Sequence, residues 1–103
     1  MKGYVLSPEA QADLSQIWDY SARNWGEEQA DRYILGIRHA CEKLADGSRQ
    51  GREIDDIRPG YRKLPVASHF LFYRITDAGL IDVIRILRRR MDVASRLQDI
   101  SAR

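Results

Sequence analysis

Two apolar runs joined by a short turn constrain the fold of this chain more than any other feature. Residues 67–75 and 80–87 are rich in β-branched and aromatic side chains, which favour β-strands. Residues 76–79 between them predict a hairpin turn, with Gly79 at a position that calls for a positive φ. Side chains alternate across a strand, and both runs carry apolar residues on either face. The predicted hairpin therefore needs cover on both of its faces.

A pair of helices is predicted ahead of this hairpin. Ser7 and Pro8 mark the start of the first helix, because serine caps a helix N-terminus and proline suits the first turn. Gly26 ends it, and the second helix runs from Glu27 to about Ala45. The inward stripes recur at three- and four-residue steps, with Leu14, Ile17, Trp18, Ser21 and Trp25 on the first helix and Ala30, Tyr33, Ile34, Ile37, Cys41 and Leu44 on the second. The short connection favours an antiparallel helical hairpin that covers one face of the sheet.

The remaining segments complete an α+β fold. Residues 4–6 form a short N-terminal strand, residues 46–60 form a polar surface loop, and residues 61–64 form a further strand. Residues 91–103 form a weak amphipathic helix that either docks on the sheet or awaits another molecule. The expected order is β-α-α-β-β-β with a short C-terminal helix, in which the helical hairpin packs on a small, mostly antiparallel sheet.

Length and composition limit the class of protein. A chain of 103 residues corresponds to one domain, residues 1–103. Its 44% hydrophobic and 31% charged residues are typical of a globular protein and unlike a disordered one. Without an apolar N-terminal signal or a transmembrane stretch, we expect a cytoplasmic protein with no membrane association. The lone Cys41 and the spacing of His39 and His69 predict no disulfide, no bound metal and no cofactor.

Charge is divided unevenly along the chain. Residues 1–51 carry six Lys/Arg against eight Asp/Glu, whereas residues 52–103 carry eleven against seven. The basic half owes its charge mainly to arginine, whose planar guanidinium suits carboxylates and phosphates. Three arginines in a row, residues 88–90, alternate between the two faces of a strand. We therefore expect the partner to be an acidic protein surface or a nucleic acid.

Several segments, taken in order, carry a resemblance to a known family. They are Pro8-Glu9-Ala10, Ile17-Trp18-Asp19-Tyr20, Asp56-Ile57-Arg58-Pro59-Gly60-Tyr61-Arg62, Tyr73-Arg74 and Arg90-Met91-Asp92. Together with the predicted order of elements, they make nearly the whole chain similar to the ParE toxins of bacterial type II toxin-antitoxin systems, within the RelE/ParE superfamily. The resemblance implies a bacterial toxin that a dimeric ParD-like antitoxin neutralises in a hetero-oligomer, and that contacts operator DNA only through that antitoxin. For the best-studied members the target is DNA gyrase, so the resemblance implies inhibition of replication.

The resemblance and the charge pattern together assign two sets of binding residues. The expected antitoxin-binding residues are Arg58, Arg62, Phe70, Phe72, Arg74 and Arg85. The expected target-binding residues, on which toxicity depends, are Arg88, Arg89, Arg90, Met91 and Leu97. The antitoxin would supply an apolar helix for affinity and acidic residues that fix register. We also expect removal of residues 92–103 to weaken toxicity more than folding.

Two other functions remain open. The superfamily includes RelE-like ribosome-dependent mRNA endonucleases. These enzymes need groups that transfer protons and cations that stabilise the charge developing on the phosphate. Those nucleases use an arginine on a strand, and the residue that best matches it here is Phe70. No tyrosine or histidine follows Arg90, so we expect no catalytic residues and a non-enzymatic toxin. A DNA-binding module is the weakest alternative, since a net charge of +2 is low for that role.

Structural roles compete with functional ones at some of these residues. Trp18 and Trp25 are interpreted as core residues, with Trp25 facing a partner as the alternative. His69 is interpreted as a strand histidine that a neighbour satisfies rather than as a general base.

Two roles are equally compatible with the arginines around the polar loop. Arg58, Arg62 and Arg74 either pair internally with Asp55 and Asp56 or bind a partner.

Overall fold

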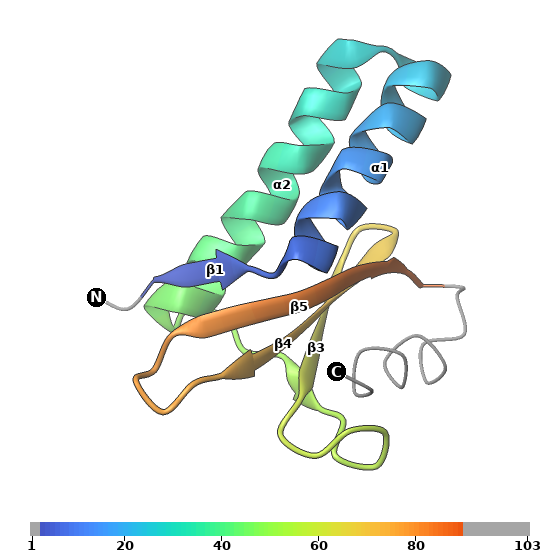
Figure 1. The fold of residues 1–103 in the computed structure, drawn as a ribbon. Coiled ribbons are helices and arrows are strands. Elements are labelled where there is room, and N and C mark those ends of the chain that lie inside the picture. Colours follow the sequence, from blue (N-terminus) through green and yellow to red (C-terminus); the bar gives the residue numbers. More distant parts are fainter. Residues whose placement is uncertain (1–2, 90–103) are drawn as a thin grey trace.

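The structure, a computed structural model, describes residues 3–89 and consists of two helices and five strands. In chain order the elements are β1 (Tyr4–Leu6), α1 (Pro8–Trp25), α2 (Glu27–Asp46), β2 (Arg52–Glu53), β3 (Arg62–Val66), β4 (His69–Ile75) and β5 (Ile81–Arg88). Figure 1 shows the two helices side by side on one face of the sheet, with their connected ends projecting beyond it. The predicted α+β class and helical hairpin are confirmed.

The strands form one mixed sheet in the order β1-β5-β4-β3-β2. β1 pairs in parallel with β5, and the other three pairings are antiparallel. Between β4 and β5 the turn follows the sequence prediction, because Gly79 has a φ of 84° and its N–H donates to the Thr76 carbonyl. The hairpin register shifts between Phe72 and Tyr73, so β5 carries one extra residue near Arg85.

Local signals account for the helical hairpin. The Ser7 hydroxyl accepts a hydrogen bond from the Ala10 N–H at 3.0 Å, and Pro8 occupies the first turn. Gly26 separates the two helices and has a φ of 92°. A residue with a Cβ would be strained in this backbone conformation. The buried face of α1 matches the predicted stripe in part: it comprises Ala10, Asp13, Leu14, Ile17 and Ser21, whereas the predicted Trp18 is half-buried and Trp25 is exposed.

Two hydrophobic clusters lie on opposite faces of the sheet. The larger one fills the space between the helices and the sheet, and its buried members include Leu14, Ile17, Ile37, Cys41, Leu71, Tyr73, Val83 and Ile86. The smaller one comprises Ile54, Phe72, Ile84 and Leu87, against which Tyr61 and Phe70 pack. The second face of the hairpin is thus covered in part by the loop that contains Ile54.

The interpretation of residues 46–60 as a surface loop was partly wrong. Two of these residues form β2, which pairs with β3, and Ile54 is only 2% exposed. The Gly51 N–H donates to the Tyr73 hydroxyl at 2.6 Å, which draws the segment onto the sheet. A Cβ at Gly51 would lie 2.6 Å from the Lys63 carbonyl oxygen. The close approach of two backbones, rather than a turn, explains the glycine at this position.

The core assignment of the two tryptophans was wrong for one of them. Trp25 is 63% exposed, because it lies at the end of α1 that projects beyond the sheet (Figure 1). Trp18 is half-buried, and its indole N–H donates to the Asp31 carboxylate at 2.8 Å. The tryptophan at the helix end is therefore part of the surface.

Some sequence predictions concern residues outside the described range. They are the C-terminal helix over residues 91–103 and the roles of Arg90, Met91 and Leu97. Within residues 3–89, no helix has the length and apolar character needed to cross a membrane. The same range holds no cluster of three or more His, Cys, Asp or Glu side chains suited to a metal ion.

Candidate binding cavity at the end of the last strand

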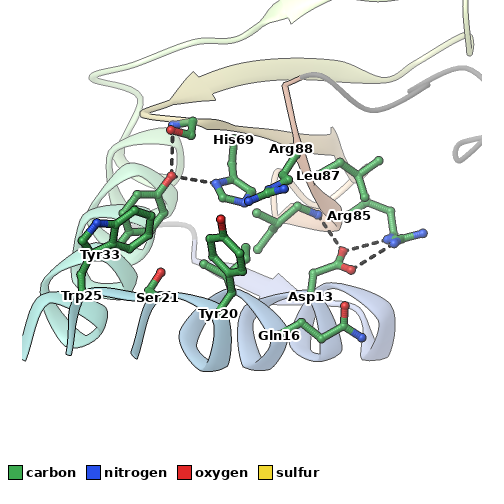
Figure 2. A pocket seen from close by; sticks show the side chains of 13 residues that line it. Asp13, Gln16, Tyr20, Ser21, Trp25, Tyr33, His69, Arg85, Leu87 and Arg88 are labelled. Atoms are coloured by element: carbon green, nitrogen blue, oxygen red, sulfur yellow. Dashed lines mark hydrogen bonds and ion pairs between the residues drawn. The ribbon is translucent and has the colours of Figure 1, made fainter. Parts of the chain in front are cut away.

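A cavity of about 310 Å³ lies between the helical hairpin and the C-terminal end of β5. Its walls come from α1, α2, the start of β4 and the last residues of β5, and Figure 2 shows the side chains that line it. Ligand sites in proteins commonly occupy about 300 to 1,000 Å³, so this cavity has the size of a small site. Its lining combines aromatic, charged and hydrogen-bonding groups.

One wall is built on the carboxylate of Asp13. This residue lies on α1 and accepts two hydrogen bonds from the Arg85 guanidinium, at 2.8 Å from Nε and 3.0 Å from Nη2. It also accepts a hydrogen bond from the backbone N–H of Ile86 at 2.9 Å. Ile86 lies on β5 beyond the residues that pair with β1, so the carboxylate takes the place of a neighbouring strand. Both charged side chains are largely buried, so their charges offset each other inside the wall.

A second wall contains a chain of hydrogen bonds through Tyr33. The Ser68 N–H donates to the Tyr33 oxygen at 3.0 Å, and the Tyr33 hydroxyl and His69 Nδ1 share a hydrogen bond of 2.7 Å. Burial lowers the pKa of His69, the nearby Arg88 guanidinium lowers it further, and Asp13 opposes them. The prediction that a neighbour satisfies His69 is confirmed.

Aromatic rings and an arginine form the open side of the cavity. The Arg88 guanidinium lies over the Tyr20 ring, 4.6 Å from its centroid. The ring of Trp25 meets Tyr20 edge to face, with centroids 5.8 Å apart. Among the residues that the structure describes, no carboxylate lies within ion-pair distance of Arg88. The rim therefore offers exposed aromatic surface beside an arginine whose charge is not neutralised by a described neighbour.

The arginines near the polar loop have internal partners, but not the predicted ones. Arg62 pairs with Glu53 at 3.2 Å, and Arg74 pairs with Asp82 at 3.1 Å. Of the two alternatives, internal pairing with Asp55 and Asp56 is not what the described residues form, and the Asp55 carboxylate instead accepts the Gly60 N–H within its own turn.

The third of these arginines makes an aromatic contact. Arg58 lies over the Tyr61 ring, 5.3 Å from its centroid. No ion pair joins it to a carboxylate in the described part of the chain.

The other predicted binding residues do not form one surface. Phe72 is completely buried in the smaller cluster, so assigning it to a contact surface was wrong for the folded chain. Phe70 is half-buried on the same face, where Lys63 and Arg89 lie 4.5 and 5.1 Å from its ring centroid. Arg88 points instead to the cavity beside the helices. Arg88, the last residue of β5, and Arg89, which follows it, thus reach opposite faces of the sheet.

The sequence interpretation gave no role to Asp13, Tyr20 or Tyr33 in a site. Asp13 had a usable signal, because it lies between Ala10 and Ile17 on the buried stripe of α1, where a carboxylate needs a partner. Neither tyrosine could be assigned to a site from the sequence, because each meets its partner only when the helices dock on β4 and β5.

The groups in the cavity favour binding over proton transfer. Nδ1 of His69 is occupied by the Tyr33 hydroxyl, and the Tyr33 oxygen already accepts the Ser68 N–H. Arginine stays protonated and serves poorly as an acid or a base. A guanidinium beside exposed aromatic rings is the combination found at the energetic centres of protein interfaces.

Comparison with known proteins gives a consistent result. Residues 4–93 match the family model described as "ParE toxin of type II toxin-antitoxin system, parDE". Toxin ParE1 of Mycobacterium tuberculosis (strain CDC 1551 / Oshkosh) is 53% identical over 90 residues, which are 87% of this chain and 92% of that protein. Toxin ParE1 of Caulobacter vibrioides is 37% identical over 97 residues, covering 94% of this chain and 99% of the relative.

A solved structure has a similar fold. A chain of the structure titled "Chromosomal ParDE TA system from P. aeruginosa" superposes with a TM-score of 0.73 at 25% sequence identity. The match covers 85% of the present chain and 96% of that one.

Proposed function

The chain belongs to the ParE toxin family of type II toxin-antitoxin systems, and from that premise we propose that a ParD-like antitoxin neutralises it by direct contact. The main support for this proposal is that the chain belongs to this family. The structural neighbour, titled as a ParDE system, supports it because its toxin-like chain shares this fold. The antitoxin is expected to be dimeric and to link the complex to operator DNA, while the toxin makes no DNA contact of its own.

We further propose that the free toxin inhibits DNA gyrase and thereby stops replication in the bacterial cytoplasm. The residues proposed for target contact are Arg88 and Arg89, with Arg90, Met91 and Leu97 beyond the described range. Both described arginines are exposed and have no carboxylate partner within residues 3–89, so an acidic surface on the target would complement them. Their side chains lie on opposite faces of the sheet, over Tyr20 and Phe70 respectively.

The proposed mode of action is binding without catalysis. A nuclease would require a group free to take the 2′-hydroxyl proton and another to protonate the leaving oxygen. Nδ1 of His69 is engaged by the Tyr33 hydroxyl, and Asp13 is engaged by Arg85, which supports the binding mode. The position that matches a nuclease arginine holds Phe70, whose ring is contacted by Lys63 and Arg89.

Inducible expression in a bacterium tests this function. DNA and protein synthesis are followed by separate pulse labels, and the purified chain is added to a gyrase supercoiling assay. Early loss of DNA synthesis together with blocked supercoiling is the expected result. Early loss of protein synthesis with cleaved messages would replace it with the nuclease function.

A control that also removes positive charge sharpens the experiment. The double variant Arg88→Gln, Arg89→Gln is expected to relieve growth inhibition and to restore supercoiling. Arg32→Gln is the control, because Arg32 is an exposed arginine on α2 whose ion pair within residues 3–89 is with Glu28, at 3.9 Å. Equal toxicity of the unaltered chain and the double variant would remove these arginines from the target surface.

A further inference from the structure

The face of the sheet away from the helices presents cationic side chains that lie on aromatic rings (Figure 1). The Lys63 ammonium and the Arg89 guanidinium lie 4.5 and 5.1 Å from the centroid of the Phe70 ring. The Arg58 guanidinium lies 5.3 Å from the centroid of the Tyr61 ring. Both rings are half-buried and pack on the smaller hydrophobic cluster. The five side chains therefore lie on one surface.

A fourth cation extends this surface to the edge of the sheet. Arg52 on β2 is opposite Lys63 on β3, and residues directly opposite each other in an antiparallel pair point to the same face. Neighbouring strands are about 4.8 Å apart, so the cations from β2 to the residue after β5 span three strand spacings, roughly 14 Å. A row of that length suits an extended partner surface rather than one small anion. We call Arg52, Arg58, Tyr61, Lys63, Phe70 and Arg89 the basic sheet face.

The four cations of the basic sheet face form no ion pair within residues 3–89. Two nearby carboxylates pair with other arginines, in the Glu53–Arg62 and Asp82–Arg74 pairs. The carboxylates of residues 55–56 form no ion pair with any of the four cations. The positive charge of this face is thus not neutralised by the described part of the chain.

The aromatic rings hold these cations in place for a partner. A cation above the face of a ring is attracted by the ring quadrupole and keeps its charge. The Arg89 guanidinium is fixed further, because it donates to the Ala67 carbonyl oxygen at 3.2 Å. A group that is already held in place gives up less conformational freedom on binding. Fixed positive charges around an apolar centre complement an acidic protein surface.

We infer that the basic sheet face is the surface with which the toxin docks on an acidic protein surface of its target, with Lys63 and Arg89 facing carboxylates around the Phe70 ring. The inference rests on the proposed function, a toxin that acts by binding gyrase, and specifies which face makes that contact. Of the two described arginines proposed for target contact, Arg89 belongs to this face, whereas Arg88 lies on the helix side of the sheet. The two arginines therefore contribute unequally.

A nucleic acid fits the basic sheet face less well. Proteins that bind single strands stack the bases on open aromatic faces. Here Lys63 and Arg89 already contact the Phe70 ring, and Phe70 meets Phe72 edge to face with centroids 5.9 Å apart. The net charge of +2 is also small for holding a polyanion. Carboxylates on a protein are the better match.

Affinity measurements between the full chain and purified gyrase, free of DNA, test the inference. The double variant Lys63→Gln, Arg89→Gln is expected to weaken binding about 10- to 100-fold, because it removes two charged contacts. The matched control is Arg32→Gln, Arg38→Gln, which removes two exposed positive charges from α2 and is expected to bind as the unaltered chain does. Lys63→Arg keeps the charge and is expected to keep the affinity. Thermal melts are expected to confirm that each variant folds.

Single substitutions compare the two faces of the sheet. Arg89→Gln alone is expected to weaken gyrase binding more than Arg88→Gln does, because only Arg89 lies on the basic sheet face. Each variant removes one guanidinium from the same end of β5, so the pair is matched in charge and position. A larger loss from Arg88→Gln would place the contact on the helix side of the sheet and overturn the inference.

A second readout locates the contact on the chain itself. Lys63 lies on the basic sheet face, whereas Lys43 is exposed on α2. Acetylation of both amines is followed by mass spectrometry in the free chain and in the presence of gyrase. Gyrase is expected to slow the reaction of Lys63 and to leave that of Lys43 unchanged, so Lys43 serves as the internal reference.

The outcomes separate the two proposals. Gyrase that binds the unaltered chain and the Lys63→Gln, Arg89→Gln variant equally well would overturn the docking face while leaving gyrase inhibition intact. Gyrase that fails to bind the unaltered chain, with no block of supercoiling, would overturn the proposed function and the docking face together. Protection of Lys63 by an oligonucleotide, by a higher concentration of the chain or already in the free chain, with none added by gyrase, would give the face to another occupant and overturn the inference.

Discussion

Asp13 and Arg85, which are 72 residues apart in the sequence, meet through a two-pronged ion pair that fastens α1 to β5. The same carboxylate accepts the Ile86 N–H, so one side chain satisfies both a buried guanidinium and a backbone donor. Removing one partner of a buried pair is costly because the other charge is left without compensation.

Asp13→Ala is expected to lower the free energy of unfolding by about 2 to 4 kcal/mol, because it leaves the Ile86 N–H and part of the Arg85 guanidinium without an acceptor. Urea denaturation followed by circular dichroism measures the change. Asp82→Ala is the matched control, since the Arg74–Asp82 pair lies nearer the surface and is expected to contribute about 0 to 1 kcal/mol. Similar losses in the two variants would contradict the structural role of Asp13.

Gly51→Ala is expected to destabilise the chain by about 1 to 3 kcal/mol, as other overpacked sites do. The added Cβ would lie 2.6 Å from the Lys63 carbonyl oxygen and 2.8 Å from the Tyr73 hydroxyl. Gly36→Ala provides the opposite case, because Gly36 lies inside α2 with no atom within 4 Å of its added Cβ. That control is expected to gain about 0.5 to 1 kcal/mol from helix propensity. The same urea experiment measures both variants, and a neutral Gly51→Ala would refute the close approach.

His69 is expected to make stability depend on pH in the weakly acidic range. Burial holds its pKa in the folded state below the ordinary value of 6.5, with Arg88 acting in the same direction. The unfolded chain therefore binds more protons as the pH falls, and stability is full above about pH 6.5 and declines below it. Denaturation at a series of pH values tests this, with His69→Asn as the comparison because the asparagine oxygen can still accept from Tyr33. A ring titration of His69 at or above the ordinary pKa would contradict the prediction.

Cys41 is expected to resist thiol reagents in the folded chain. The thiol is buried between the helices and the sheet, and burial raises its pKa to about 11, so little thiolate forms near neutral pH. Labelling with a chromogenic disulfide reagent is expected to be slow in buffer and complete in concentrated urea. Fast labelling of the native chain would mean that the large cluster opens readily near this residue.

Local signals predicted most of the fold, and contacts distant in sequence account for what was missed. The Ser7-Pro8 start, the Gly26 break and the turn at Gly79 act within a few residues, so the hairpins could be placed. β2 has two residues, too few to show the alternation of apolar and polar side chains that predicts a strand, and it forms by pairing with β3.

The candidate site was harder to predict than the fold. The cavity brings together residues from α1, α2, β4 and β5, and no spacing within one segment reveals that meeting. Trp25 followed the buried stripe in sequence, yet it lies where the helices project beyond the sheet (Figure 1). The strand arginines were recognisable as a group, but the partner of each depends on register and on the shift beside Phe72.

The way α1 closes over β5 also affects how the chain behaves in a crowded solution. β1 pairs with only three residues of β5, and the remaining strand would present open backbone groups that invite strands from other molecules. Ser7 takes up the Val83 and Ile84 carbonyls, and Asp13 takes up the Ile86 N–H. The chain is thereby protected along this margin of the sheet against aggregation and against strand exchange with other molecules.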